Sequence, residues 1–120
     1  MYRFTIKGEI MPYVRMTRRG KWINPRARAY LASKEAIGWQ YRAQMAMNDW
    51  PMLPGQTSLR VCIEFGYCKH TGDIDNLAKA TIDAGNGIIW PDDRWIDALE
   101  VIRLDTGIAR TELTVEVKGE

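Results

Sequence analysis

Hydrophobic and polar residues alternate along three stretches of the chain, residues 2–10, 59–67 and 111–118. Alternation with a period of two is typical of a β-strand that buries one of its faces. A fourth stretch, residues 98–104, is more continuously apolar, which predicts a largely buried strand. A Thr-Gly turn at 106–107 lies between this stretch and the last one, so we expect these two strands to form a hairpin.

Two other stretches have the periodicity of helices. The first covers residues 24–49 and starts with Asn-Pro, an N-cap residue followed by a proline at the first helical position. Its apolar residues form two stripes, so it must bury more than one face, against the sheet and against either a partner subunit or the rest of the domain. The second covers residues 74–84, and the Gly85-Asn86-Gly87 that follows is typical of a left-handed C-cap. The stripes of the first helix are Tyr30, Leu31, Ile37, Tyr41 and Met45, and Ala32, Ala36, Trp39, Ala43 and Met47.

The elements follow one another in the order strand, helix, strand, helix, strand, strand. This order predicts an α+β fold in which two helices pack on one face of a mixed β-sheet of about four strands. A chain of 120 residues can form one hydrophobic core but not two. We therefore expect residues 1–120 to form a single domain.

The sequence lacks the features of a membrane or secreted protein. No apolar run approaches the roughly 20 residues that span a bilayer, and residues 1–7 alternate like a strand instead of forming the apolar centre of a signal peptide. Cys62, Cys68 and His70 have a spacing that matches no standard zinc site and lacks a ligand. We expect a cytoplasmic protein with reduced cysteines, without zinc and without membrane contact.

The net charge of +2 is unevenly distributed along the chain. Residues 1–60 carry eleven basic and three acidic residues, a net charge of +8, whereas residues 61–120 carry six basic and twelve acidic residues, a net charge of −6. A basic half attracts a polyanion and an acidic half binds cations. This division suits a protein that holds nucleic acid with one part and cuts it with another. The alternative is a solvated surface whose asymmetry arose by chance.

Acidic residues gather at both ends of the second predicted helix. Asp73 and Asp75 lie at its start, and Asp92 and Asp93 follow it after a short loop. Inside the helix these residues have a purely structural explanation, because Asp73 can serve as the N-cap and Asp75 meets the helix dipole favourably. Lys79 can also form i,i+4 ion pairs with the acids on either side of it. The helix alone therefore does not require a function.

The segments beside the helix favour a metal site. The strand at residues 59–67 leads directly to Asp73, so that the acids lie at a strand-to-helix junction. Residues 88–91 can then return the chain and bring the second acid pair near the helix start. Three carboxylates in one place repel one another unless a divalent cation lies between them. Magnesium suits such a site because it takes a few carboxylates, several waters and the phosphate oxygens of a substrate.

Three groups of residues follow one another along this part of the chain: Asp73-Ile74-Asp75-Asn76-Leu77-Ala78-Lys79-Ala80, then Asp83-Ala84, then Asp92-Asp93. This order resembles the RusA family of Holliday junction resolvases, which are common in phages and prophages. The chain length, the strand before the motif and the basic loop before the first helix are also similar, so the resemblance covers most of the chain. It implies a homodimeric, magnesium-dependent endonuclease that nicks two opposed strands of a four-way DNA junction.

The resemblance also implies roles for individual residues. Asp73, Asp75 and Asp93 match the metal-binding catalytic acids, with Asp92 as an alternative ligand, and Lys79 matches the catalytic lysine. The cofactor is then Mg²⁺, with Mn²⁺ as a substitute. Lys79 would neutralise charge that develops on the phosphate in the transition state, or assist the leaving oxygen. The basic residues expected to contact the phosphates of DNA are Arg15, Arg18, Arg19, Lys21, Arg26, Arg28 and Lys69.

Other interpretations remain open at this stage. Two symmetric cuts need two active sites related by a two-fold axis, which a dimer supplies, and the second stripe of the first helix and the strand edges are both candidate contact surfaces. A non-catalytic module that binds branched DNA would use the same basic half. A metal-dependent hydrolase of small nucleotides would have no use for that half.

Overall fold

The computed structural model describes residues 1–14, 25–67 and 72–118. Within these ranges the chain is α+β, and the order of its strands and α-helices agrees with the prediction. The elements are β1 (Tyr2–Lys7), α2 (Pro25–Asn48), β2 (Leu59–Tyr67), α3 (Ile74–Asp83), the 3₁₀-helix η1 (Asp93–Trp95), β3 (Ile96–Asp105) and β4 (Arg110–Val117).

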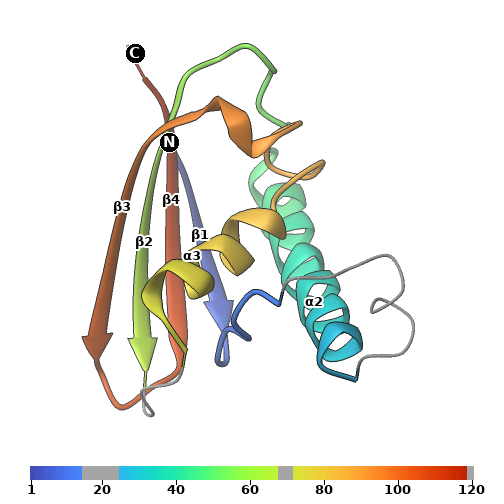
Figure 1. Cartoon of the computed structure of the whole chain (residues 1–120). Helices are drawn as coiled ribbons and strands as arrows, with labels where there is room; N and C mark the ends of the chain where they lie inside the picture. The colour runs from blue at the N-terminus through green and yellow to red at the C-terminus, as the bar shows by residue number, and fades with distance from the viewer. Residues whose placement is uncertain (15–24, 68–71, 119–120) are drawn as a thin grey trace.

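The four strands form one mixed sheet in the order β1-β4-β2-β3. β4 pairs with β1 and with β2 in antiparallel orientation, whereas β3 pairs with β2 in parallel orientation. A parallel pair needs a connection that returns the chain to the starting end of the strand. Here α3 and η1 provide this connection, and they bring the acidic part of the sequence to one side of β3 (Figure 1).

The predicted hairpin between the last two strands is wrong, because β2 lies between β3 and β4. The four residues 106–109 join these two strands across the end of β2. When extended, four residues span about 13 Å. This length exceeds the distance of about 9.6 Å, two inter-strand spacings, that separates β3 from β4. Gly66 makes this crossing possible: a Cβ atom there would lie 2.8 Å from Thr106 Oγ1 and 2.9 Å from the Arg110 carbonyl oxygen.

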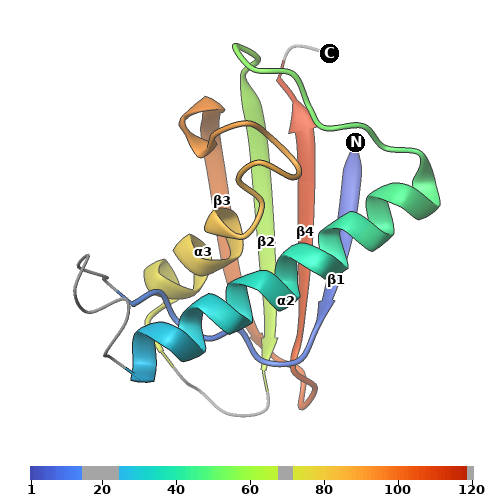
Figure 2. The ribbon, with the colours of Figure 1, turned by 90° about the vertical axis from the view of Figure 1, so that its right-hand side faces the viewer.

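Both helices cover the same face of the sheet (Figure 2). The core lies between them and the sheet, where the inward residues of β2 and β4 are fully or almost fully buried. The first predicted stripe of α2 faces this core, since Tyr30, Ile37, Tyr41 and Met45 are all buried. Tyr41 also donates a hydrogen bond of 2.8 Å to the carbonyl oxygen of Thr81 at the end of α3. α2 therefore supports α3 from behind.

The second apolar stripe of α2 is left exposed. All five of its residues are exposed to solvent, and Trp39 and Met47 have 59% and 83% of their surface accessible. Within the described ranges, the rest of the domain therefore does not wrap this face. Its contact with a partner subunit stays a prediction.

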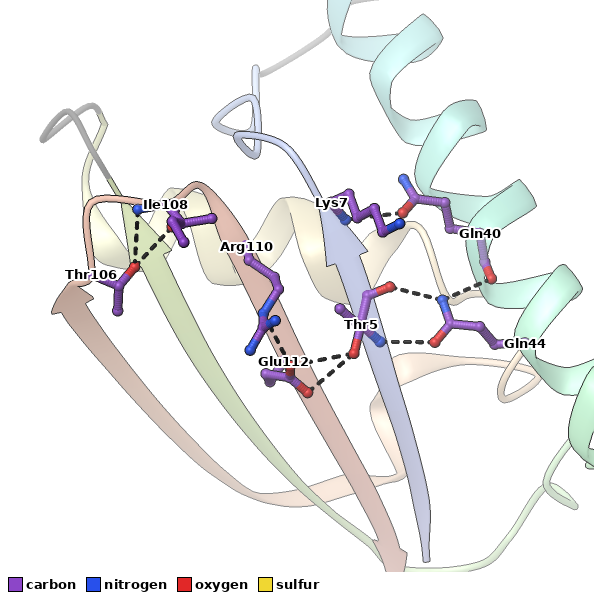
Figure 3. Close-up of polar contacts among 8 residues, drawn as sticks. All are labelled: Thr5, Lys7, Gln40, Gln44, Thr106, Ile108, Arg110 and Glu112. Atoms are coloured by element: carbon purple, nitrogen blue, oxygen red, sulfur yellow. Dashed lines mark hydrogen bonds and ion pairs between the residues drawn. The ribbon is translucent and has the colours of Figure 1, made fainter.

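The β1 edge of the sheet is closed by side chains of α2 (Figure 3). Gln44 accepts a hydrogen bond from the Thr5 backbone N–H through Oε1 and donates one to the Thr5 carbonyl oxygen through Nε2, both at 2.8 Å. Gln40 Oε1 accepts a further one from the Lys7 backbone N–H at 3.0 Å. Backbone groups that an edge strand usually leaves to solvent or to another strand are thereby paired.

The β3 edge is different. The sequence pattern predicts a largely buried strand here, but β3 is an edge strand that is only partly covered, with Leu99 and Leu104 each almost half exposed. The apolar residues of β3 are divided between two environments: some line the space beside α3, and others are partly exposed to solvent. Continuous apolar sequence does not distinguish this case from full burial.

α3 ends differently from the prediction at residues 85–87. Its C-cap, Ala84, has right-handed helical angles, and the left-handed residue is Gly87, with φ of +75°. Gly85 is required for packing, since a Cβ atom there would lie 3.0 Å from the ring of the buried Trp90. The glycines thus let the chain turn tightly around Trp90.

Several predicted residues lie outside the described ranges: Arg15, Arg18, Arg19, Lys21, Cys68, Lys69 and His70. Among the described residues, no helix is both long enough and apolar enough to cross a membrane.

Candidate active site

A pocket of about 610 Å³ opens between α3 and β3. Its charged wall consists of Asp75, Lys79 and Asp83 from α3, and Asp93 from the first position of η1. The remaining wall is apolar and comes from both elements: Ile74, Ala78, Ile82, Ile96, Leu99 and Val101. The pocket therefore places three carboxyl groups and one ammonium group beside an apolar surface.

The spacing of α3 brings its charged residues onto one face. Asp75, Lys79 and Asp83 follow one another at intervals of four residues, which stacks them on successive turns of a helix. The opposite face of α3 is buried through Leu77, Ala80 and other small or apolar residues. Packing of that face fixes which way the charged face points, so the core orients the acids.

Asp73 occupies the N-cap position of α3, as predicted, with extended backbone angles. Its side chain makes no capping hydrogen bond; its backbone carbonyl oxygen accepts the first one of the helix, from Leu77 N–H at 3.0 Å. The carboxylate is exposed and is not used for capping. It lies at the same end of α3 as Asp75, two residues away.

Asp93 is held by a short chain of side-chain hydrogen bonds. Trp90, which is fully buried, donates from Nε1 to Asn86 Oδ1 at 2.7 Å. Asn86 in turn donates from Nδ2 to Asp93 Oδ2 at 3.3 Å. The indole thus fixes the orientation of the amide, and the amide presents its N–H groups to the carboxylate. A core residue thereby positions a carboxylate of the pocket.

Asp92 has a separate task in this structure. It caps η1 by accepting a hydrogen bond of 2.9 Å from the Arg94 backbone N–H. Asp93, and not Asp92, contributes to the lining of the pocket. The two neighbouring acids are therefore distinguished by their positions: one closes the turn and the other faces α3.

Asp83 is a half-buried carboxyl of the pocket, as is Asp93, whereas Asp75 is exposed. Burial raises the pKa of Asp83 above its usual value, and the charge of Asp93 raises it further. Lys34, Lys79 and a 3.3 Å hydrogen bond from the Tyr30 hydroxyl oppose this rise in the pKa without cancelling it. The raised pKa means that the anionic form of Asp83 is disfavoured in the folded protein, mainly because burial removes the carboxylate from water.

Lys79 lies with its Nζ 4.1 Å from the centroid of the Tyr13 ring. The contact is a cation–π interaction, in which the ammonium is attracted to the negative face of the ring. Tyr13 belongs to the segment after β1, so the contact joins two parts of the chain that are far apart in sequence. The ammonium therefore has a defined place beside the pocket.

The donor groups of the pocket are carboxylate oxygens, the ligands preferred by hard divalent cations. Within residues 1–14, 25–67 and 72–118, however, no three His, Cys, Asp or Glu side chains are grouped closely enough to hold a metal ion. The chemistry of the donors fits a hard cation such as Mg²⁺.

Of the residues expected to contact DNA, Arg26 and Arg28 are described. Both are exposed on the first turn of α2. Arg15, Arg18, Arg19, Lys21 and Lys69 lie outside the described ranges.

Sequence reasoning gave no site role to three residues beside the pocket: Asp83, Asn86 and Tyr13. Asp83 continues the four-residue spacing of Asp75 and Lys79 and belongs to the ordered motif, but the spacing indicated an ion pair and the motif assigned it no role. The Asn86 contact depends on how the turn folds around Trp90, and the Tyr13 contact depends on how the segment after β1 returns to α3. Periodicity carries neither kind of information.

The family model described as Endodeoxyribonuclease RusA matches residues 5–116 of the chain. The comparison with curated proteins finds no match.

Proposed function

The chain belongs to the RusA family of endodeoxyribonucleases, and we propose on this basis that it is a magnesium-dependent enzyme that resolves four-way (Holliday) DNA junctions by paired, symmetric phosphodiester cleavage. The observation that carries this proposal is the pocket shared by Asp75, Lys79, Asp83 and Asp93. Carboxylates that line one pocket together with a lysine offer oxygen ligands for a hard cation and a positive charge for a phosphate.

In this proposal Asp75 and Asp93 hold the cation, and Asp73 joins them from the exposed start of α3. When bound, Mg²⁺ would polarise the scissile phosphate as a Lewis acid and make a water molecule a better nucleophile. Mn²⁺, which also accepts oxygen ligands, is expected to substitute for it. Asp92 remains engaged as the cap of η1, which favours Asp93 as the ligand of this pair.

The protein side chains provide the remaining contributions. Lys79 compensates the negative charge that builds up on the phosphate oxygens in the transition state. Asn86 holds Asp93 in one orientation through its 3.3 Å hydrogen bond. Asp83 adds negative charge behind the ligands and so strengthens the attraction for a cation.

Outside the pocket, we propose that basic residues hold the DNA backbone. Arg26 and Arg28 lie at the exposed start of α2, and the sequence places five further candidates at Arg15, Arg18, Arg19, Lys21 and Lys69. Such contacts position DNA without reading its sequence and weaken as salt increases. We further propose that residues 1–120 act as one nuclease domain, in the cytoplasm.

Symmetric cleavage also leads us to propose a homodimer, because a two-fold axis supplies two equivalent active sites. Two exposed surfaces could form the contact. One is the second stripe of α2 around Trp39, and the other is the open β3 edge around Leu99, with 59% and 48% of these side chains accessible. Sedimentation of Trp39→Asp and Leu99→Asp would identify the contact. The variant at the contact should be monomeric, and a wild type that is monomeric at micromolar concentration would contradict the dimer.

The experiment that tests the function uses a synthetic four-way junction and a linear duplex of the same sequence. With Mg²⁺ we expect paired nicks at symmetric positions in two opposed strands of the junction and little cleavage of the duplex. Chelation with EDTA should stop cleavage and leave junction binding in place. A protein that binds the junction but never cuts it, with Mg²⁺ or Mn²⁺, would instead be a non-catalytic binding module.

A further inference from the structure

The ammonium group of Lys79 is placed by an aromatic ring. Its Nζ lies 4.1 Å from the centroid of the Tyr13 ring, although the side chain of Lys79 is otherwise on the exposed face of α3. An exposed lysine has four rotatable bonds and occupies many rotamers. A ring at this distance favours the rotamers that keep the ammonium beside it.

Tyr13 is itself well anchored. Its backbone N–H donates a hydrogen bond of 3.1 Å to the carbonyl oxygen of Asn76, on the first turn of α3. Its ring packs edge-on against Tyr30, with centroids 5.6 Å apart and planes at 84°. Tyr30 is only 2% exposed and its hydroxyl donates to Asp83. Tyr13 is therefore held to α3 through its backbone and to the core through its ring.

The residue before Tyr13 fits against the start of α3 just as closely. A Cβ atom at Gly72 would lie 2.5 Å from Pro12 Cγ, and Gly72 has a left-handed φ of +70°. Both facts require glycine at this position. The segment before Tyr13 thus approaches α3 at the residue preceding Asp73, and its placement is not a loose surface contact.

From these contacts we infer that Tyr13 is a positioning residue for the proposed reaction: its ring holds the Lys79 ammonium where it can meet the phosphate bound beside Asp75 and Asp93. This inference rests on the proposed nuclease function. Tyr13 touches neither the substrate nor the reacting atoms. It acts by reducing the number of rotamers that Lys79 occupies.

The first test compares Tyr13→Leu with Tyr13→Phe. Leucine removes the ring and keeps an apolar side chain, whereas phenylalanine keeps the ring. We expect Tyr13→Leu to lower kcat for junction cleavage by about 2- to 30-fold, the range that corresponds to a cation–π contact. KM should change by less than about twofold. Tyr13→Phe should keep the kcat of the wild type. Tyr2→Leu, whose ring stacks on Trp50 at a distance of 4.7 Å, is the matched control and should leave kcat unchanged.

The second test does not depend on cleavage. Protons of the Lys79 ε-CH₂ group should be shifted upfield by the ring current of Tyr13 in a ¹³C-lysine NMR spectrum, with the signal assigned by Lys79→Arg. The shift should persist in Tyr13→Phe and disappear in Tyr13→Leu. Lys79 signals at random-coil positions in the folded wild type, or wild-type kcat in Tyr13→Leu, would overturn the inference. A wild type that cleaves no junction would overturn the proposed function alone, because the NMR shift still decides whether Tyr13 holds Lys79.

Discussion

At the β1 edge of the sheet, polar side chains complete the fold, whereas at the β3 edge they line a pocket. Gln40 and Gln44 pair with backbone groups of β1 at 2.8–3.0 Å. Beside β3, burial raises the pKa of Asp83 on α3, and the charge of Asp93 on η1 raises it further. Paired polar groups stabilise a structure, while like charges held together cost stability unless a ligand compensates them. This difference supports our proposal that the β3 side carries the function.

If this comparison is correct, the largest effect on cleavage comes from the charged face of α3. Lys79→Ala should lower the rate of junction cleavage by about 10²-fold or more, the usual loss when a group that stabilises transition-state charge is removed. The melting temperature should change little, because the side chain is exposed. Lys118→Ala, at another exposed position, is the control for net charge. Equal loss in both variants would show that Lys79 contributes only bulk charge.

Asn86 connects the pocket with the core, because it hydrogen-bonds to both Asp93 and Trp90. Asn86→Ala should therefore affect both activity and stability. Without Asn86, Asp93 loses its donor and the Nε1–H of Trp90 loses its acceptor. We expect a decrease of roughly tenfold in cleavage rate, since partners that orient metal ligands typically contribute 10- to 100-fold. The free energy of unfolding should fall by about 1–3 kcal/mol. A rate and a stability like those of the wild type would show that the hydrogen-bond chain has no role.

At the closed edge the expected effect is on stability alone. Gln44→Ala removes two hydrogen bonds to Thr5, so the free energy of unfolding should fall by about 1–2 kcal/mol, measured by urea denaturation. Cleavage by the folded variant should match the wild type. Glu35→Ala, at an exposed position of the same helix, serves as the control. Reduced cleavage by folded Gln44→Ala would mean that the two edges are not functionally separate.

The smallest effect concerns the pH dependence of stability in EDTA. Because the folded-state pKa of Asp83 is raised, the unfolded state loses its proton first as pH rises, and the stability contribution of Asp83 decreases up to its folded-state pKa. Asp83→Asn should therefore be slightly more stable than the wild type at neutral pH, and this advantage should disappear in acid. Thermal melts from pH 3 to 8 measure it. A variant less stable than the wild type at pH 7 would contradict the sign.

The sequence predicts much of the fold because a buried face produces a periodic pattern of hydrophobic residues. The alternation in β2 and the stripe of Tyr30, Ile37, Tyr41 and Met45 in α2 correspond directly to buried faces. The wrong prediction of a hairpin between β3 and β4 shows that periodicity does not determine which strands are neighbours. Residues 106–109 can cross the end of β2 only because Gly66 has no side chain. This space depends on how β2, the connection and β4 pack together, and no single segment of the sequence contains that information.

The candidate site shows the same limit. Motif order and helical spacing both mark Asp75 and Lys79, and motif order alone marks Asp93. Asp83 was visible in the spacing, but its burial was not. Tyr13 and Asn86 reach the pocket only through tertiary contacts, with Lys79 and with Trp90 and Asp93 respectively. Residues that position catalytic groups are therefore the part of a site that sequence patterns reveal least.

The measurement that tests the central claim most directly is single-turnover cleavage of a four-way junction in Mg²⁺ by the wild type, Asp75→Asn and Asp49→Asn. Asp49 is exposed at the end of α2 with a left-handed φ of 53°, which asparagine adopts readily, so its variant is a matched carboxylate-to-amide control. We predict paired cleavage by the wild type and by Asp49→Asn, and a loss of at least about 10²-fold in Asp75→Asn with unchanged junction binding. Undiminished cleavage by Asp75→Asn would contradict the assignment of this pocket as the nuclease centre.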